Sequence, residues 1–374
     1  MLTITDCYTE VLPCLKEDLG NHDSLLFFDI ETTGLSARSS QLYLIGCLHI
    51  QEENFFFRQW FAESSADEPL LLDAFSSYLA ELPSDCLLLH FNGNGFDIPY
   101  LRQKYESHSR EFPLDSMESL DLYRMIRPHK KVLGLASLRQ KAIEDYLGIV
   151  RTDPFDGGQL IAVYENYLKT RSREGLSALL AHNDEDVRNM PRLLAILSLN
   201  DYMEANYRLT GCRLHDTQNL SGQKRRELLV NLESPVSLPR PISVRTDTGL
   251  YLTASGTRIS LAAPLAELCL KHYFPDAKNY FYLPEEDRAI HKSVGIYVDK
   301  DHRIRATKDN CYIKKEGCFL PCPPDMEIKD EEAVVFCQDR RDKDFYLEWS
   351  DTDAGLLMED FWNRFVHALW KSRR

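Results

Sequence analysis

Apolar residues in the first sixty positions recur in short runs bounded by polar turns. The run at 24–30 begins a stretch that reads SLLFFDIETTGL, and two further runs follow at 41–50 and 54–61. Runs of this length, rich in Phe, Ile and Leu and separated by the polar turn at 51–53, are typical of β-strands. The pattern therefore predicts three sequential strands in an antiparallel meander.

Helical spacing appears next. Apolar residues in 68–82 recur every three or four positions and stop at Pro83, which predicts an amphipathic helix. The almost continuously apolar run at 86–91 predicts a strand that is buried on both faces. Further helices are predicted at 137–147, where Gly148 follows, and at 159–170, 175–181 and 185–199. Pro191 implies a kink in the last of these or a later start.

The pattern changes after residue 200. Residues 201–240 are polar, and prolines at 235, 239 and 241 mark their end, which predicts a connector with one short helix. Beyond it, short strands are predicted at 242–245, 249–254 and 257–262, a hairpin at 333–337 and 344–349, and a helix at 354–371. The chain is thus predicted to have a mixed α/β domain at 1–200, a connector at 201–240, and a smaller α+β module at 241–374.

Composition narrows the class of protein. The chain has 374 residues, of which 44% are hydrophobic, and a net charge of -14. This length accommodates two domains, and no apolar run is long enough to span a membrane. Because the N-terminus lacks a basic start and an apolar core, we expect a cytoplasmic protein. The negative charge disfavours a protein that coats nucleic acid nonspecifically, although local basic patches can still hold phosphates.

The ten cysteines are expected to be reduced thiols. A zinc site is the alternative for Cys311, Cys318, Cys322 and Cys337, because Cys318 and Cys322 have zinc-ligand spacing. The cluster lacks a paired Cys-x2-Cys motif, which favours buried or incidental thiols.

Carboxylates mark the ends of several predicted elements. Asp29 and Glu31 are two residues apart on one strand, so their side chains point to the same face. Asp97 follows the strand at 86–91 after the Gly-rich turn 92–95, and Asp186 belongs to the acidic string 182–186, at the start of the helix predicted at 185–199. Two carboxylates that converge repel each other unless a cation lies between them, and divalent cations prefer oxygen ligands. An acidic turn exposed to solvent is the alternative for Asp29 and Glu31 taken alone, and a helix first-turn acid is the alternative for Asp186.

The three acidic segments together resemble the ribonuclease-H-like fold of the DEDD 3′-5′ exonucleases. FFDIETTGL is similar to the first motif of that family, and FNGNGFDIPYL is similar to the second, over about residues 24–200. The chain also resembles the YprB-like ribonuclease-H-like domains, whose third motif is Tyr-Asn-x-x-Asp-Val where this chain has His182-Asn183-Asp184-Glu185-Asp186-Val187.

The resemblance implies a function and a set of site residues. The function is two-metal hydrolysis of phosphodiester bonds in single-stranded DNA or RNA, which releases nucleoside 5′-monophosphates. The implied ligands of two divalent cations, Mg²⁺ or Mn²⁺, are Asp29 as a bridging residue, Glu31, Asp97 and Asp186. The implied contacts to the terminal nucleotide are Thr32, Thr33 and Asn94.

The third motif departs from the family pattern. The family has either Tyr-x3-Asp or His-x4-Asp, whereas His182 stands at the tyrosine spacing, His-x3-Asp. An imidazole could take a proton from the attacking water or orient it. A helix-cap or surface histidine is the alternative.

Two other features bear on partners. A basic run lies between the acidic motifs, at Arg124, Arg127, His129, Lys130 and Lys131, and is either a phosphate-contacting patch or a solvated surface. In the C-terminal module, aromatics at 280–282 lie close to basic residues at 288–292, a composition that suits single-stranded nucleic acid or an ordinary core with a charged rim. The module could equally bind a protein partner. The alternative to a nuclease is a catalytically weak or inactive nucleic-acid-binding or scaffolding protein with the same fold.

Overall fold

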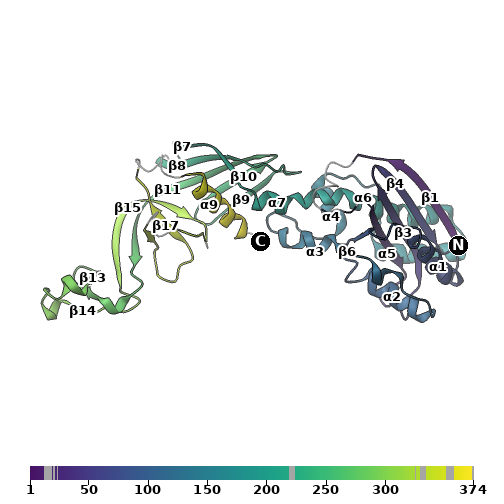
Figure 1. Ribbon diagram of the computed structural model, residues 1–374, viewed down its shortest axis with the longest axis horizontal. Coiled ribbons are helices and arrows are strands. Elements are labelled where there is room, and N and C mark those ends of the chain that lie inside the picture. Colours follow the sequence, from purple (N-terminus) through teal and green to yellow (C-terminus); the bar gives the residue numbers. More distant parts are fainter. Residues whose placement is uncertain are drawn as a thin grey trace. The chain divides into compact units, whose positions relative to one another are not determined.

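The chain divides into two units, Met1–Leu199 and Asn200–Arg374, in a computed structural model. The structure describes residues 1–11, 19, 22, 24–218, 224–324, 326–328, 334–350 and 358–372. Figure 1 shows both units, with the sequence running from purple to yellow. Among the helices of these described residues, none combines the length and the apolar character needed to cross a lipid bilayer.

The first unit is built on a six-stranded mixed sheet with the order β1-β4-β3-β2-β5-β6. In chain order the strands are β1 (Leu2–Thr9), β2 (Ser24–Thr32), β3 (Leu42–Gln51), β4 (Asn54–Phe61), β5 (Leu87–His90) and β6 (Ser119–Asp121). Strands β1 to β4 pair antiparallel, whereas β2, β5 and β6 run parallel to one another. The three carboxyl ends of β2, β5 and β6 therefore meet at one edge, where open sheets of this kind place their ligands.

Helices cover both faces of this sheet (Figure 1). The helices of this unit are α1 (Glu68–Leu79), α2 (Asp97–Ser107), α3 (Leu122–Ile126), α4 (Gln140–Leu147), α5 (Gly157–Thr170) and α6 (Arg173–Leu193), with short 3-10 turns at Ser65–Asp67, Pro113–Ser116, Arg127–His129 and Leu194–Ile196. Helices α1 and α6 pack directly on the strands, whereas α4 and α5 pack on α6. On one face Phe28 of β2 packs against Phe75 of α1, with the ring centroids 6.2 Å apart. The other face carries Asp29 and is covered by α6.

The predicted meander, the helix α1 and the strand β5 agree with the structure to within a few residues. The first strand, β1, was not predicted, because its Thr-rich sequence lacks an apolar run. The helix predicted at 137–147 begins only at Gln140 and ends at Leu147, and it is capped by Gly148, whose φ of 76° is readily adopted by glycine.

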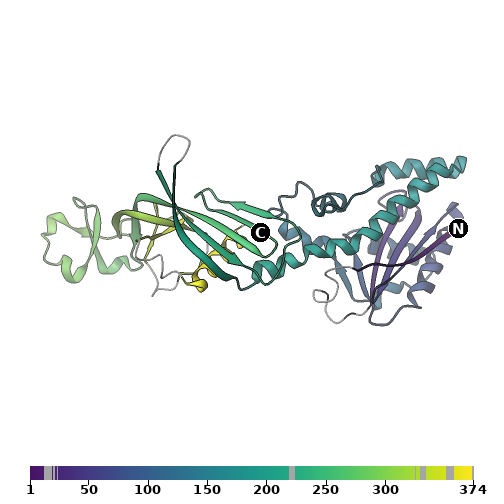
Figure 2. The same ribbon diagram turned by 90° about the horizontal axis from the view of Figure 1, so that it is seen from above.

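Helix α6 corrects the prediction of two helices at 175–181 and 185–199. It is one continuous helix, Arg173–Leu193, which is seen as the long teal helix in Figure 2. Asp186 therefore lies in the middle of a helix, not at a helix start. The prediction was wrong because the polar residues 182–186 interrupt the apolar period, although two of them, His182 and Asn183, are buried against the sheet.

The second unit is rich in β-structure. Its strands are β7 (Arg208–Gln218), β8 (Lys224–Glu233), β9 (Ile242–Arg245), β10 (Tyr251–Ser255), β11 (Arg258–Tyr273), β12 (Tyr280–Leu283), β13 (Arg288–His291), β14 (Ile304–Arg305), β15 (Tyr312–Cys322), β16 (Val335–Phe336) and β17 (Phe345–Glu348). Its helices are α8 (Lys292–Gly295) and α9 (Glu359–Lys371), with 3-10 turns at Ala277–Asn279 and Lys300–His302, while α7 (Ser198–Glu204) spans the boundary between the units.

An eight-stranded sheet organises this second unit. The long strand β11 pairs with β8 and β10 through its first half and with β15 through its second half. Strands β12, β13 and β14 form a separate three-stranded sheet, which contains the aromatic segment at 280–282. The hairpin predicted near 333–349 is present as β16 and β17, although residue 333 lies outside the described residues, as do 354–357 of the predicted C-terminal helix.

The predicted connector at 201–240 is corrected by β7 and β8. These two strands pair with each other over most of their length, and β8 is part of the large sheet. Leu228, Val230 and Leu232 alternate with less buried residues and are themselves buried, so the two-residue period of a strand is present in this polar segment.

Candidate active site

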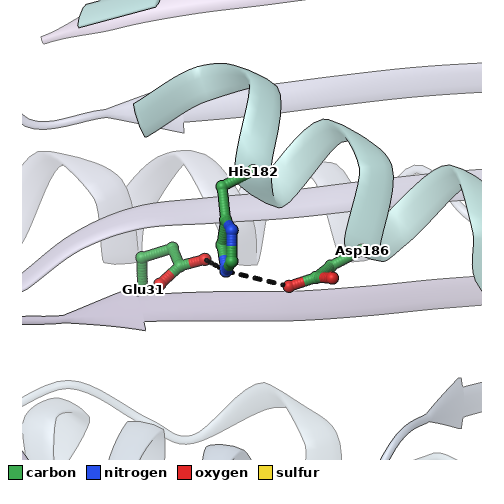
Figure 3. Close-up of side chains that lie close together, drawn as sticks. All are labelled: Glu31, His182 and Asp186. Carbon is green, nitrogen blue, oxygen red and sulfur yellow. Dashed lines mark ion pairs between the residues drawn. The ribbon is translucent and has the colours of Figure 1, made fainter. Parts of the chain in front are cut away.

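Three side chains that could bind a metal converge between β2 and α6. Their ligand atoms, one each from Glu31, His182 and Asp186, lie within 4.8 Å of one another. The imidazole Nε2 of His182 is 3.6 Å from Oε1 of Glu31 and 3.3 Å from Oδ2 of Asp186. Figure 3 shows the ring pointing from α6 toward β2, between the two carboxylates. No other group of this kind, including the four cysteines 311, 318, 322 and 337, occurs among the residues that the structure describes.

Helical geometry explains why His182 and Asp186 meet. Residues four apart on a helix lie on the same face, so both side chains point toward the sheet. His182 is only 5% exposed, which excludes the surface-histidine alternative. The spacing His-x3-Asp, which departs from the family's histidine version, therefore directs the imidazole into the site.

Asp29 is held beside this group by Asn183. The Asn183 side-chain amide donates a hydrogen bond to Oδ2 of Asp29 (3.0 Å) and accepts one from Nε2 of Gln59 (2.9 Å). Asn183 is completely buried, and its close approach depends on Gly46 of β3, where a Cβ atom would lie 2.0 Å from Oδ1 of Asn183. The register places Gly46 opposite Asp29, so one glycine makes room for the residue that orients the carboxylate.

Asp97 reaches the same edge from α2. The chain turns sharply after β5, where a Cβ on Gly93 would lie 2.7 Å from the His90 ring, and α2 begins at Asp97. The pKa of Asp97 is raised to about 7, chiefly by burial and also by the charges of Asp121 and Asp186, while hydrogen bonds from the backbone amides of Asp97 itself and of Ile30 partly offset the rise. The bond from Ile30 places the Asp97 carboxylate against β2.

The carboxylates of the site repel one another. Burial, followed by the charges of Asp97, Glu31 and Asp186, holds the pKa of Asp29 well above its usual value. Burial and the charges of Asp186 and Asp97 do the same to the pKa of Glu31. Several buried carboxylates at one point are costly unless a cation neutralises them, so this donor set fits a divalent metal.

Two residues that sequence reasoning missed orient the site. Asp153 accepts a hydrogen bond from Nδ1 of His182 (Oδ2, 2.5 Å), and Arg151 pairs with Oδ1 of Asp186 (Nη1, 2.6 Å). Both lie in a loop after α4 without any hydrophobic period. The missed Asn183 was more accessible to sequence reasoning, because it falls within the third motif that the chain shares with the YprB-like domains.

The predicted nucleotide contacts lie in the loops around the site. The Thr32 hydroxyl donates to the carbonyl of Gly34 (2.9 Å), and the Thr33 hydroxyl accepts from the amide of Gln41 (2.8 Å). Both hydroxyls thus hold the loop after β2. Asn94 is half-buried in the turn before α2, and its contact with a nucleotide stays a prediction.

The fold and this edge of the sheet define a ribonuclease-H-like domain. Residues 26–198 match a family model described as the RNase_H superfamily, which confirms the predicted fold of the first unit. The chain is similar to the uncharacterized protein YprB of Bacillus subtilis (strain 168), with 28% identity over 188 residues that cover 49% of this chain. The match covers 42% of YprB, so less than half of that protein is represented here.

Solved structures of exonuclease I also show similarity. The zinc-bound complex of E. coli exonuclease I with single-stranded DNA is 15% identical, with a TM-score of 0.29 over 57% of this chain and 55% of that chain. A complex of exonuclease I with SSB-Ct is 15% identical, with a TM-score of 0.30 over 57% of this chain and 56% of that chain. The fold assignment rests on the superfamily match and on the strand order.

Proposed function

We propose that the first unit is a metal-dependent nuclease that acts as a 3′-5′ exonuclease on single-stranded DNA or RNA and releases nucleoside 5′-monophosphates. The observation that carries this proposal is the convergence of Glu31, His182 and Asp186, with Asp29 and Asp97 beside them, at the carboxyl ends of the parallel strands. We assign the binding of two divalent cations, Mg²⁺ or Mn²⁺, to the four carboxylates.

Bound divalent cations would supply Lewis acidity at the phosphate and at the attacking water. The protein's own contribution is to hold the ligands before substrate arrives. Asn183 fixes one oxygen of Asp29, Arg151 fixes one oxygen of Asp186, and the backbone of β2 fixes Asp97. His182 adds an imidazole, which has two chemical uses at such a site, as a proton acceptor and as a nitrogen ligand.

A polyanionic substrate is supported by the basic run that follows β6. Arg124, Arg127, Lys130 and Lys131 are exposed, whereas His129 is buried. The run begins at α3, directly after the carboxyl end of β6, and so lies at the edge of the sheet that carries the acidic residues. Exposed cations at that edge suit a nucleic-acid backbone that enters the site.

The test uses 5′-labelled DNA and RNA oligonucleotides of matched sequence, with Mg²⁺, Mn²⁺ or EDTA. We expect a ladder that shortens one nucleotide at a time from the 3′ end and requires metal. Asp186→Asn should reduce the rate of cleavage by at least about a hundredfold, because one of the four carboxylates that would bind the divalent cations is lost. Asp184→Asn is the matched control, since Asp184 pairs with Arg188 (2.9 Å) on the same helix and lies outside the metal-ligand group.

An intact protein that cleaves neither DNA nor RNA, at the end or internally, with any divalent metal would refute the nuclease. If it still bound single-stranded nucleic acid, the scaffolding alternative would stand instead. Internal cleavage without progressive shortening would replace the exonuclease by an endonuclease and leave the metal site in place.

A further inference from the structure

The His182 imidazole is held from both of its nitrogens. Nδ1 bonds to Oδ2 of Asp153 at 2.5 Å, and Nε2 faces Glu31 and Asp186 at 3.6 and 3.3 Å. Asp153 is itself fixed by Lys141 (Nζ, 2.9 Å) and by the Phe155 amide (3.0 Å). A neutral imidazole that donates from Nδ1 to a carboxylate has its lone pair on Nε2, and here Nε2 is the nitrogen that faces the two other carboxylates.

The two carboxylate oxygens of Asp186 likewise have different partners. Oδ1 is bound by Nη1 of Arg151 at 2.6 Å, while Oδ2 faces Nε2 of His182. Arg151 is almost buried and is held in turn by Glu144 (2.9 Å) and Glu185 (3.2 Å). The residues that orient His182 and Asp186 thus bind the atoms that point away from the cluster and leave Nε2 and Oδ2 pointing into it.

Metal ligands in proteins are commonly arranged like this. A coordinating histidine usually donates its other N–H to a carboxylate, and a coordinating carboxylate is itself hydrogen-bonded. A histidine that serves only to accept a proton from water needs its free nitrogen open to that water. Here Nε2 is enclosed between two carboxylates, and the side chain is 5% exposed.

We propose that Nε2 of His182 is itself a metal ligand, together with Glu31 and Asp186, and that this nitrogen makes the site select Mn²⁺ over Mg²⁺. Imidazole suits transition metals, whereas Mg²⁺ prefers oxygen ligands in an octahedral arrangement. This inference rests on the proposed function only for the presence of a divalent metal. It adds the His182 nitrogen as a ligand and a preference for Mn²⁺ over Mg²⁺.

The experiment measures Mn²⁺ binding without substrate. Electron paramagnetic resonance of free Mn²⁺ gives the affinity, competition with Mg²⁺ gives the selectivity, and electron spin echo modulation detects a coordinated imidazole nitrogen. We expect nitrogen modulation in the unmodified protein and its loss in His182→Gln, with Mn²⁺ affinity reduced by at least about tenfold and Mg²⁺ affinity much less affected.

Two further variants separate ligation from folding. Asp153→Asn leaves the imidazole in place but weakens its orientation, so Mn²⁺ affinity should fall about tenfold while the domain stays folded. Asp184→Asn should keep both the affinity and the nitrogen signal. Because the signal is first read in the unmodified protein, the proposal can fail even if His182→Gln does not fold.

The outcomes distinguish this inference from the proposed nuclease. Bound Mn²⁺ without nitrogen modulation, or with the same signal in His182→Gln, overturns the ligand assignment and leaves a nuclease in which His182 handles protons. Nitrogen coordination without nucleolytic activity upholds the ligand assignment and refutes the nuclease. A protein that binds neither metal overturns both.

Discussion

Replacement of Gly46 by alanine should displace α6 relative to β3 and destabilise the first unit. A Cβ at this position would lie 2.0 Å from Oδ1 of Asn183, 2.8 Å from its Cγ and 3.0 Å from Cγ2 of Val187. Real Cβ contacts stay above 3.0 Å, so either β3 or α6 must shift by about 1 Å at this point. The Asn183 side chain is fully buried and cannot move without losing its bonds to Asp29 and Gln59.

The cost follows from these contacts. Overpacking in a core costs about 1–3 kcal/mol, and a buried polar group that loses its partner costs about 1–3 kcal/mol more. A loss of about 3 kcal/mol lowers the Tm of a unit of this size by about 6–12 °C. Differential scanning calorimetry of the full chain would measure the shift.

Gly157→Ala is the matched control for Gly46→Ala. A Cβ at Gly157, the first residue of α5, meets nothing within 4 Å, so alanine should change stability by no more than about 1 kcal/mol, in the favourable direction. Adding Asn183→Ala to Gly46→Ala should cost little more, because the atoms that clash are gone. The reasoning is refuted if Gly46→Ala unfolds at the same temperature as Gly157→Ala, or if the effects of Gly46→Ala and Asn183→Ala are additive.

Three other perturbations test separate parts of the molecule. Because the folded protein raises the pKa of Asp97 to about 7 from its ordinary 3.8, this carboxyl stabilises the metal-free protein below pH 4, and the stabilisation is lost as the pH rises toward 7. In EDTA, the urea concentration at the midpoint of unfolding should therefore decrease as the pH rises from 5 to 7.5, and it should decrease less in Asp97→Asn. An equal decrease in both proteins would contradict the raised pKa of Asp97. Reversing the charges of Lys130 and Lys131 should weaken single-stranded DNA binding and flatten its salt dependence by about 0.7 per lost phosphate contact, measured by fluorescence anisotropy. An unchanged slope would place the nucleic acid elsewhere. In the second unit, Asn363→Leu should cost about 2–5 kcal/mol in denaturant unfolding, because the buried Asn363 amide bonds both the N–H (2.6 Å) and the carbonyl (2.8 Å) of Tyr207. A cost below about 1 kcal/mol would show that water replaces these bonds.

The strands of the first unit were predictable because their burial follows a simple apolar period. The same rule failed for α6, because some of the buried residues of this helix are polar. His182 and Asn183 are buried because they bond to Asp153 and Asp29, and a hydrophobicity pattern carries no information about such bonds. The prediction of a connector over the strands at 208–233 was wrong for the opposite reason. The alternation of buried and exposed residues was present, but the many polar residues of this segment favoured a connector.

The site itself was partly predictable. Asp29 and Glu31 were predicted because the strand period is two, and Asp97 and Asp186 were predicted from their places at the ends of predicted elements and from motif similarity. Arg151 and Asp153 were not, because a loop that reaches the site has no periodicity, and its partners lie about thirty residues further along the chain. Only the folded structure brings this loop against α6.

The arrangement of His182, Asn183 and Asp186 on one helix has a consequence for how the chain can change. A substitution on the outer face of α6 leaves the relative positions of these three residues intact. An inserted or deleted residue between His182 and Asp186 would rotate one relative to the other by about 100°, because a helix has 3.6 residues per turn. The segment 182–186 should therefore tolerate a change of length far less well than a change of identity at Asp184. A single-residue insertion there should abolish metal binding while the helix itself remains formed.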